Sequence, residues 1–192
     1  MASRRTNREV EIKLKPASAH VARRILRQAG FGVERKRIFE DNILFDMDDL
    51  TLRQTGRLLR IRRAGRETLL TYKGQAAPGK HKSREELEIH VSDALLTSTI
   101  IERLGFAPVF RYQKYRTEYA HPGERGVVTL DETPIGCFLE VEGSPGWIDR
   151  TARRLGFQES DYITRSYGGL YLEHRRQHPE SPADMIFAKR TT

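Results

Sequence analysis

Seven short segments of the sequence place charged or polar residues at every second position, with mainly apolar residues between them. In residues 9–15, for example, Glu9, Glu11 and Lys13 alternate with valine, isoleucine and leucine. A period of two residues predicts a β-strand, whose side chains point alternately to opposite faces. The other six segments carry on one face Arg60 and Arg62; Thr71 and Lys73; Arg84, Glu86 and Glu88; Lys114 and Arg116; Thr129 and Asp131; and Glu140 and Glu142.

The order of the expected elements favours one fold class. Strands are expected at residues 9–15, 39–47, 57–63, 68–73, 83–91, 109–120, 126–131 and 136–142, and helices at 18–29, 92–104, 148–155 and 162–174. Consecutive strands favour antiparallel pairing, so we expect an α+β fold: a closed eight-stranded antiparallel β-barrel with flanking helices. If the apolar faces pack outward under the helices, the charged faces converge in the lumen, which in a barrel of eight strands holds one small ligand.

Two alternative explanations of the charge pattern involve no ligand. A single alternating strand is more often a solvated outer face, and an ion-pair-laced surface is typical of heat-adapted proteins. Seven such strands with complementary signs weaken the first explanation. The second does not explain why acids gather on the first and last strands and bases on the middle ones.

A lumen with both signs of charge indicates a metal–phosphate ligand. Burying this many charges without partners would be unfavourable by many kcal/mol. Hard divalent ions such as Mg²⁺ or Mn²⁺ suit carboxylates, and arginine and lysine side chains suit phosphate oxygens. The sequence therefore predicts a metal-dependent site for a polyphosphate.

The bulk properties are consistent with one soluble domain. We expect residues 1–176 to form it, and the polar, Pro-containing residues 177–192 to be a flexible tail. No apolar run approaches the ~20 residues of a membrane-spanning helix, no secretory signal is visible, and the single cysteine, Cys137, fits a reducing cytoplasm. The net charge of +8 favours anionic partners. RNA is the less favoured one, because no aromatic platforms interleave with the basic runs.

Residues 9–13 match an E-x-E-x-K signature, and further segments follow in a familiar order: 41–46, 59–62, 70–74 (Leu-Thr-Tyr-Lys-Gly), 83–88, 114–116, 130–131, 136–143 and the pair Ser166-Tyr167. From about residue 8 to 172 the chain thus resembles the CYTH superfamily, the triphosphate tunnel metalloenzymes, and within it the class IV adenylate cyclase-like and thiamine triphosphatase-like branch. The resemblance implies an eight-stranded antiparallel tunnel that binds a triphosphate.

The resemblance also implies roles for individual residues. The expected metal ligands are Glu9, Glu11, Asp131, Glu140 and Glu142. The expected phosphate-binding residues are Lys13, Arg60, Arg62, Lys73, Lys114, Arg116 and Arg165, the last on a helix that plugs the tunnel in some relatives. The expected catalytic residues are Glu9, Glu11, Lys13, Glu86, Glu88 and Lys114. Leu44 departs from the family pattern, because many relatives have tyrosine there.

Several functions remain open at this level. Hydrolysis of inorganic triphosphate or a related compound is favoured, ahead of conversion of ATP to cyclic AMP and pyrophosphate, since no purine-specific constellation is visible. Hydrolysis of thiamine triphosphate ranks third. A non-catalytic module that binds polyphosphate or nucleotides is a further alternative. Such a module would need the basic residues but not the acidic ones, so the presence of the acidic residues counts against it. A homodimer is a further expectation if apolar strand faces stay uncovered.

Overall fold

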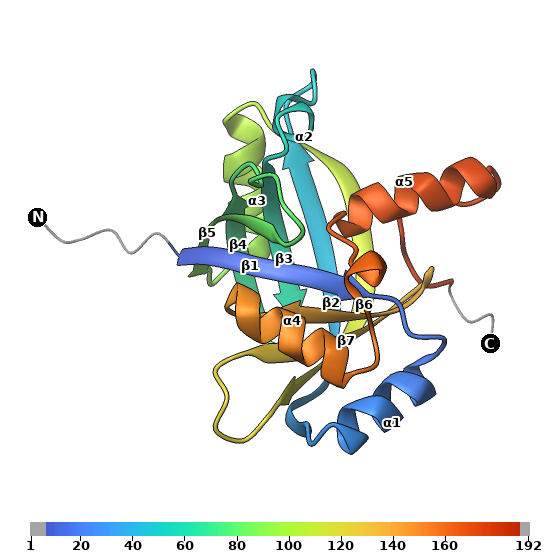
Figure 1. Ribbon diagram of the computed structural model, residues 1–192. Helices are drawn as coiled ribbons and strands as arrows, with labels where there is room; N and C mark the ends of the chain where they lie inside the picture. The colour runs from blue at the N-terminus through green and yellow to red at the C-terminus, as the bar shows by residue number, and fades with distance from the viewer. Residues whose placement is uncertain (1–6, 189–192) are drawn as a thin grey trace, which may run out of the picture.

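Eight antiparallel strands form a closed barrel in the computed structural model, which describes residues 7–188. Around the barrel the strands follow the order β1-β5-β4-β3-β2-β6-β7-β8 (Figure 1). Their bounds are β1 Asn7–Leu14, β2 Gly32–Asp46, β3 Leu58–Ala64, β4 Glu67–Lys73, β5 Lys82–His90, β6 Ala107–Ala120, β7 Val127–Thr133 and β8 Gly136–Glu142. The closed antiparallel barrel confirms the predicted fold class.

The helices lie on the outside of the barrel and at one of its ends (Figure 1). Their bounds are α1 Ala19–Gln28, α2 Thr51–Gln54, α3 Ala94–Arg103, α4 Pro145–Arg154 and α5 Tyr167–Gln177, with a 3₁₀ turn at Glu159–Asp161. No helix between residues 7 and 188 is both long enough and apolar enough to cross a membrane.

The pleat of β1 shows how the sequence pattern divides the barrel wall. Glu11 and Lys13 point into the lumen, whereas Ile12 and Leu14 are fully buried on the outer side. There they join the largest apolar core, which α1 and α4 close against β1, β7 and β8. Because successive side chains alternate, burial of the apolar face under the helices forces the charged face inward.

One close contact fixes α4 on this core. Gly126 lies against the indole ring of Trp147, where any Cβ atom would overlap the ring. Trp147 is buried, and its Nε1–H donates to the carboxylate of Glu124. Position 126 therefore requires glycine, because a larger residue would displace the indole ring. Helix α4 covers the outer face of β1 and β8.

Two strand edges are completed by short segments from elsewhere in the chain. The pairing of β1 with β5 ends at Glu11, and beyond it Lys13 exchanges two backbone hydrogen bonds of 2.9 Å with Ile163. The pairing of β6 with β7 starts at Tyr115, and the free edge before it is taken by Met185, which bonds to the backbone of Arg111 and Gln113. Such bridges satisfy backbone groups that an open edge would leave unpaired.

The structure differs from the sequence-based expectations at four places, and the bridges account for the first two of them. The helix expected at 162–174 begins only at Tyr167, because Ile163 is extended beside β1 and Ser166 caps the helix. The tail expected from 177 is packed in its described part, since the side chain of Met185 is fully buried; residues 189–192 lie outside the described residues. Strand β2 starts at Gly32 rather than at residue 39, and α4 starts at Pro145 rather than at 148.

Candidate functional site

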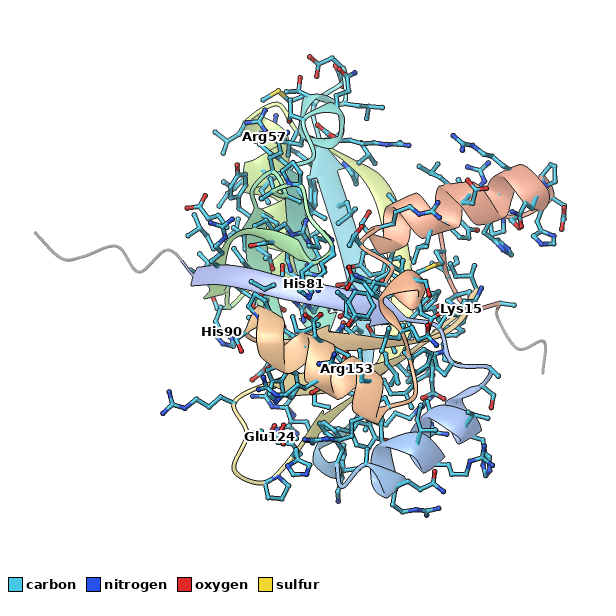
Figure 2. All side chains as sticks on the ribbon, viewed as in Figure 1. Lys15, Arg57, His81, His90, Glu124 and Arg153 are labelled. Carbon is cyan, nitrogen blue, oxygen red and sulfur yellow. The ribbon has the colours of Figure 1, made fainter. Side chains whose placement is uncertain are left out.

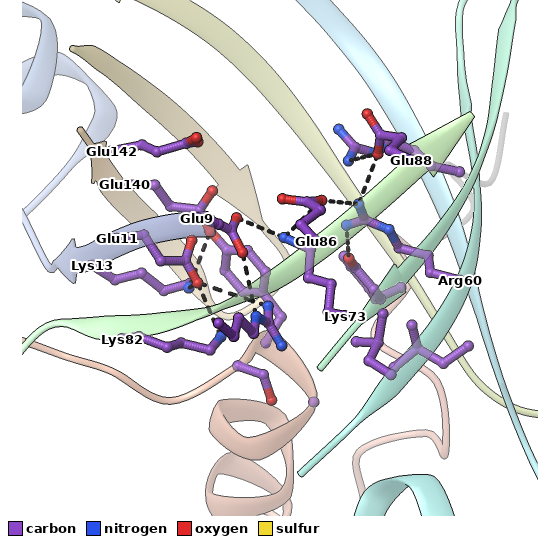
Figure 3. A pocket seen from close by; sticks show the side chains of 18 of the residues that line it. Glu9, Glu11, Lys13, Arg60, Lys73, Lys82, Glu86, Glu88, Glu140 and Glu142 are labelled. Carbon is purple, nitrogen blue, oxygen red and sulfur yellow. Dashed lines mark hydrogen bonds and ion pairs between the residues drawn. The ribbon is translucent and has the colours of Figure 1, made fainter. Parts of the chain in front are cut away.

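The lumen of the barrel holds a cavity of about 640 Å³, which we call the tunnel (Figure 3). Eight cationic side chains line it: Lys13, Arg60, Arg62, Lys73, Lys82, Arg84, Lys114 and Arg116. Six carboxylates line it as well: Glu9, Glu11, Glu86, Glu88, Glu140 and Glu142. The glutamates of β1 and β8 lie apart from the cations of β3, β4 and β6, whereas β5 carries both signs and β1 also carries Lys13. The cations are in excess.

One side of the tunnel is acidic because two neighbouring strands contribute glutamates. Strand β1 supplies Glu9 and Glu11, and β8 supplies Glu140 and Glu142, with Glu11 directly opposite Glu142 in the register. Five of the tunnel cations contact these glutamates, one of them being Arg116 of β6, which pairs with Glu140. Lys13, Lys82 and Arg84 lie opposite their partners in the strand register, whereas Lys73 and Arg116 reach over from β4 and β6. The other contacts are Lys73 Nζ to Glu9 at 2.6 Å, Arg84 Nε to Glu9 at 3.3 Å, Lys82 Nζ to Glu11 at 3.0 Å and Lys13 Nζ to Glu140 at 3.1 Å.

The opposite wall is basic and comes from β3, β4 and β6. The Arg60 guanidinium donates to the Tyr112 hydroxyl at 3.2 Å and lies 3.6 Å from Glu88. Arg62 contacts Glu88 at 3.2 Å, and Lys73 contacts Glu86 at 3.1 Å. The acids of β5 thus lie between the basic wall and the acidic wall (Figure 3).

Ion pairing keeps most of these groups charged although they are buried. Burial alone would raise the pKa of Glu11, but Lys13, with Lys82 and Lys73, holds that pKa well below its ordinary value in spite of the nearby negative charge of Glu140. Burial would lower the pKa of Lys13, but Glu11 and Glu140 hold it well above its ordinary value. Behind the basic wall, burial of Glu40 is outweighed by Lys114, Arg116 and Arg62, which lower its pKa to about 2. The tunnel is therefore a set of fixed charges.

Like Glu86, whose pKa burial raises, Glu142 departs from this pattern. Loss of water contact, followed by the negative charges of Glu9 and Glu11, raises its pKa to about 7. No lysine, arginine or histidine of the described residues forms a salt bridge with it. Glu142 is therefore the one carboxyl of the acidic side that has no cationic partner among residues 7–188.

Asp131 lies behind the basic wall rather than in the tunnel. It is fully buried and receives hydrogen bonds from Lys114 Nζ at 2.7 Å, Arg116 Nε at 2.7 Å and the Tyr167 hydroxyl at 2.6 Å. Its carboxylate is thus engaged by three donors and holds Lys114 and Arg116 in place. Its predicted role as a metal ligand stays a prediction, and in the structure its carboxylate is occupied by these donors.

Arg165 is the other predicted residue that the structure places outside the tunnel. Its side chain is exposed on the segment before α5, and the tunnel is lined there by Ser166, Tyr167 and Gly168 instead. The remaining twelve predicted site residues all line the tunnel: Glu9, Glu11, Lys13, Arg60, Arg62, Lys73, Glu86, Glu88, Lys114, Arg116, Glu140 and Glu142. Their roles stay predictions, but their convergence is observed.

Four ionisable residues of the tunnel were missing from the predicted set. The alternation placed Arg84 on the face of Glu86 and Glu88, but no role was assigned to it. Lys82 shares that face and Tyr112 shares the face of Lys114, so the same alternation could have found both. Tyr167 could not be found this way, because it reaches the tunnel from the first turn of α5.

Comparison with known proteins shows which family the chain belongs to. The family model described as CYTH domain matches residues 7–167. The chain belongs to the CYTH family. Members of this family bind triphosphates and generally depend on metal ions. The match covers all eight strands and ends at the residue where α5 enters the tunnel.

Relatives of this CYTH protein are found in both sequence and structure. A protein of Methanocaldococcus jannaschii, provisionally named as an adenylate cyclase, is 33% identical over 136 residues, which cover 71% of this chain and 77% of that protein. The PH1819 protein of Pyrococcus horikoshii has a TM-score of 0.75 at 29% identity, covering 87% of this chain and 99% of that one.

A plant relative shares the fold at lower identity. It is a provisionally named adenylyl cyclase from Hippeastrum, with a TM-score of 0.66 at 18% identity, and covers 86% of this chain and 96% of its own. That plant protein is described as having a dominant triphosphatase activity.

The acidic side of the CYTH tunnel fits the metal that the family requires. Between residues 7 and 188, no group of three or more His, Cys, Asp or Glu side chains is arranged to hold a metal ion, because the glutamates of β1 and β8 are turned toward lysines and arginines. Glu142 has no cationic partner among the described residues, and four carboxylates on adjacent strands are the oxygen donors that a hard divalent ion prefers.

Proposed function

We propose that this protein is a metal-dependent triphosphatase that hydrolyses inorganic triphosphate or a related compound in the tunnel. The supporting observation is that carboxylates of β1 and β8 and cations of β3, β4 and β6 line one cavity, with the cations in excess. A triphosphate carries about four to five negative charges near neutral pH, and the basic wall together with one or two divalent ions would neutralise them. The triphosphatase activity described for the Hippeastrum relative agrees with this choice.

Substrate binding is proposed as an exchange of ion partners. In the structure Lys73, Lys82 and Arg84 are paired with Glu9 and Glu11. Phosphate oxygens would take over these cations, and the released carboxylates would bind the metal. Because charges of both signs are replaced together, neither the cations nor the acids become unpaired in a buried site.

The remaining steps are assigned to residues of the tunnel. Arg60, Arg62, Lys114 and Arg116 would orient the phosphate chain and stabilise the charge that develops on the transferred phosphoryl group. A divalent ion, Mg²⁺ or Mn²⁺, held by the glutamates of β1 and β8 would supply Lewis-acid stabilisation of the same charge. Glu86, whose pKa burial raises, is our candidate for accepting the proton of the attacking water.

Replacement of Glu9 tests this function. We expect Glu9→Gln to lower kcat for inorganic triphosphate by about 100-fold or more, because metal binding loses a charged ligand while the shape of the side chain is kept. Glu85→Gln is the matched control, since Glu85 is exposed on the outer face of β5. Full metal-dependent activity of Glu9→Gln would contradict the proposal.

An assay panel separates the alternatives. Purified protein with Mg²⁺ or Mn²⁺ is given inorganic triphosphate, ATP and thiamine triphosphate, and both phosphate and cyclic AMP are measured. Phosphate from inorganic triphosphate without cyclic AMP supports a triphosphatase. Cyclic AMP and pyrophosphate from ATP would instead identify a cyclase, which the names of several relatives suggest. Tight binding without turnover would indicate a non-catalytic binding module.

The enzyme is proposed to work in the cytoplasm as a homodimer. The single cysteine, Cys137, has no partner for an internal disulfide and is consistent with a cytoplasmic location. Apolar residues exposed on α3 are consistent with a homodimer.

A further inference from the structure

Three hydroxyl groups line the tunnel together with its charged side chains, and they belong to Tyr112, Ser166 and Tyr167. The Tyr167 hydroxyl donates to Asp131 at 2.6 Å, and the Ser166 hydroxyl accepts from the backbone N–H of Gly169 at 3.2 Å, where it caps α5. Both hydroxyls are thus engaged in holding α5. The Tyr112 hydroxyl comes from β6 instead, and it contacts the basic wall.

The hydrogen of the Tyr112 hydroxyl has no acceptor among residues 7–188. The oxygen receives a hydrogen bond from Arg60 Nη1 at 3.2 Å, which occupies one of its lone pairs. Glu86 and Glu88 lie 4.0 and 3.6 Å from the Arg60 guanidinium, and neither forms a hydrogen bond with Tyr112. Because a buried donor without an acceptor is unfavourable, the hydrogen is available to a ligand of the tunnel.

The charges around this hydroxyl favour an anionic acceptor. Burial would raise the pKa of Tyr112, but the positive charges of Arg60, Lys114 and Arg62 lower it. The same cations would attract a negatively charged group to the position beside the hydroxyl. The acid labelled in Figure 2, Glu124, lies on the loop between β6 and β7, away from α5, whereas Tyr112 packs against α5. That acid therefore does not reach the hydroxyl.

Packing from several elements holds the Tyr112 ring in place. The ring stacks on Phe110 of the same strand with centroids 5.9 Å apart, and it lies 5.9 Å from the ring of Tyr167 on α5. Met185 joins the same buried cluster, and its backbone bonds to both neighbours of Tyr112 in β6. Since the side chain is already ordered, its hydroxyl loses little freedom when a ligand binds.

We propose that the Tyr112 hydroxyl donates a hydrogen bond to a phosphate oxygen of the triphosphate in the tunnel. This inference rests on the proposed function, because the tunnel must hold a triphosphate. Arg60 has two roles in this arrangement: it binds the phosphate chain, and its hydrogen bond to the Tyr112 oxygen leaves the hydroxyl hydrogen free for the ligand. A neutral donor adds a charge-assisted hydrogen bond without increasing the excess of positive charge.

The test is equilibrium binding of a triphosphate analogue in which methylene groups replace the bridging oxygens, so that it is not hydrolysed. Binding is measured by calorimetry with Mg²⁺ at fixed salt concentration. Tyr112→Phe removes one oxygen and keeps the ring. We expect it to raise the Kd about five- to tenfold, the effect of losing one charge-assisted hydrogen bond.

The matched control is Tyr115→Phe, the same substitution on the same strand. Tyr115 does not line the tunnel, and its ring packs against Phe39 and Arg37. We expect this control to leave the Kd unchanged. Urea denaturation without ligand shows that each variant is folded before the Kd values are compared.

A double-mutant cycle with Arg60→Met separates direct contact from an effect through Arg60. If the hydroxyl contacts the ligand, Tyr112→Phe also raises the Kd at least about twofold when Arg60 is methionine. If the hydroxyl only holds the guanidinium in place, Tyr112→Phe has no effect in that background.

Two results would overturn the inference. One is an unchanged Kd for Tyr112→Phe in the otherwise wild-type protein. The other is a weakening that disappears in the Arg60→Met background, which would make Tyr112 a support for Arg60 and not a ligand-binding residue. Neither result depends on turnover. Failure of the proposed function would instead appear as an absence of hydrolysis of inorganic triphosphate by the wild-type protein, with the binding differences still measurable.

Discussion

At the scale of single residues, Tyr167 shows how a side chain outside the barrel wall supports the tunnel. Its hydroxyl donates to Asp131 at 2.6 Å, and the ring lies 5.2 Å from Lys13 Nζ and 5.1 Å from Lys114 Nζ. Burial and the negative charge of Asp131 raise the pKa of Tyr167, so the hydroxyl stays a donor. Asp131 in turn orients Lys114 and Arg116.

Tyr167→Phe should therefore destabilise the protein although it removes a single oxygen. We expect a loss of about 1–2 kcal/mol in the free energy of unfolding, measured by urea denaturation, because a buried carboxylate loses one donor. Tyr115→Phe is the control, since the Tyr115 ring packs against Phe39 and Arg37 and its hydroxyl has no partner among the described residues. Equal stability of Tyr167→Phe and the wild type would contradict the assigned role.

Glu40 leads to a prediction about pH. Its pKa is lowered to about 2 in the folded protein, against an ordinary value of 4.5, so ionised Glu40 stabilises the fold at neutral pH. This contribution is complete above about pH 4.5 and is lost as the pH falls through about 2. Glu40→Gln should thus lower stability by about 2–3 kcal/mol at pH 7 and by progressively less below pH 4.5.

Thermal unfolding at pH 7, 4 and 3 measures this difference. Glu118→Gln is the control, because Glu118 contacts only Arg35, whose side chain is 72% exposed, and surface pairs contribute little. The stability difference between the wild type and Glu40→Gln should become smaller as the pH falls. If it stays the same, the loss of stability comes from the changed packing of the side chain and not from its lost charge.

Much of the site could be predicted from the sequence at this scale. The two-residue period fixes which side chains share a face, so twelve of the proposed residues line the tunnel. The pattern could not show that Asp131 is enclosed, because that depends on Tyr167, which lies 36 residues further along the chain. Nor could it place Arg165, whose direction is set by the turn before α5.

At the scale of elements, the C-terminal segment acts as a partial strand of the barrel. Met185 bonds to the free edge of β6, and its side chain packs with Tyr112, Phe138, Tyr167 and Tyr171. The Tyr171 hydroxyl also donates to the carbonyl of Pro182 at 2.8 Å. The segment therefore holds α5, and with it Tyr167, against the end of the tunnel.

Met185→Ala tests this element. We expect it to lower the free energy of unfolding by about 2–4 kcal/mol, as for other fully buried aliphatic side chains replaced by alanine. Met47→Ala is the matched control, because Met47 is 39% exposed and should lose less than about 0.5 kcal/mol. If Met185→Ala is as stable as the control variant, the packing of this segment against the barrel does not contribute to the stability of the fold.

The elements that the sequence mispredicted share a physical cause. Polar, Pro-containing residues 177–188 carry no periodic signal, and their order comes from one buried methionine and an edge of β6 that no local pattern reveals. The strands whose faces differ in polarity were placed within a few residues, whereas β2 was predicted to start seven residues too late because residues 32–38 have exposed side chains on both faces. Long-range pairing with β6 extends that strand.

At the scale of the whole molecule, the apolar surface is concentrated on α3. Helix α3 covers the outer wall through Ile101, which packs with Phe45 and Ile61. Four aliphatic side chains of α3 and its C-cap remain largely exposed: Leu95 (79%), Leu96 (57%), Ile100 (53%) and Leu104 (69%). Three of them, at positions 96, 100 and 104, follow each other at four-residue intervals and form one stripe along the helix.

We expect this stripe to pair with its copy in a second molecule. Antiparallel packing about Ile100 would place Leu96 against Leu104 of the other copy, and would bring Asp93 at one helix end toward Arg103 at the other end. Neither of these two charged groups has a salt-bridge partner among residues 7–188. Ile100→Glu would put like charges at the centre of the contact, so it should convert a dimer into a monomer in size-exclusion chromatography with light scattering. Val33→Glu, at a 57% exposed position on β2, should leave the dimer intact. A wild-type protein that stays monomeric at about 100 µM would contradict the expected self-association, because a dimer with a Kd in the micromolar range is populated at that concentration.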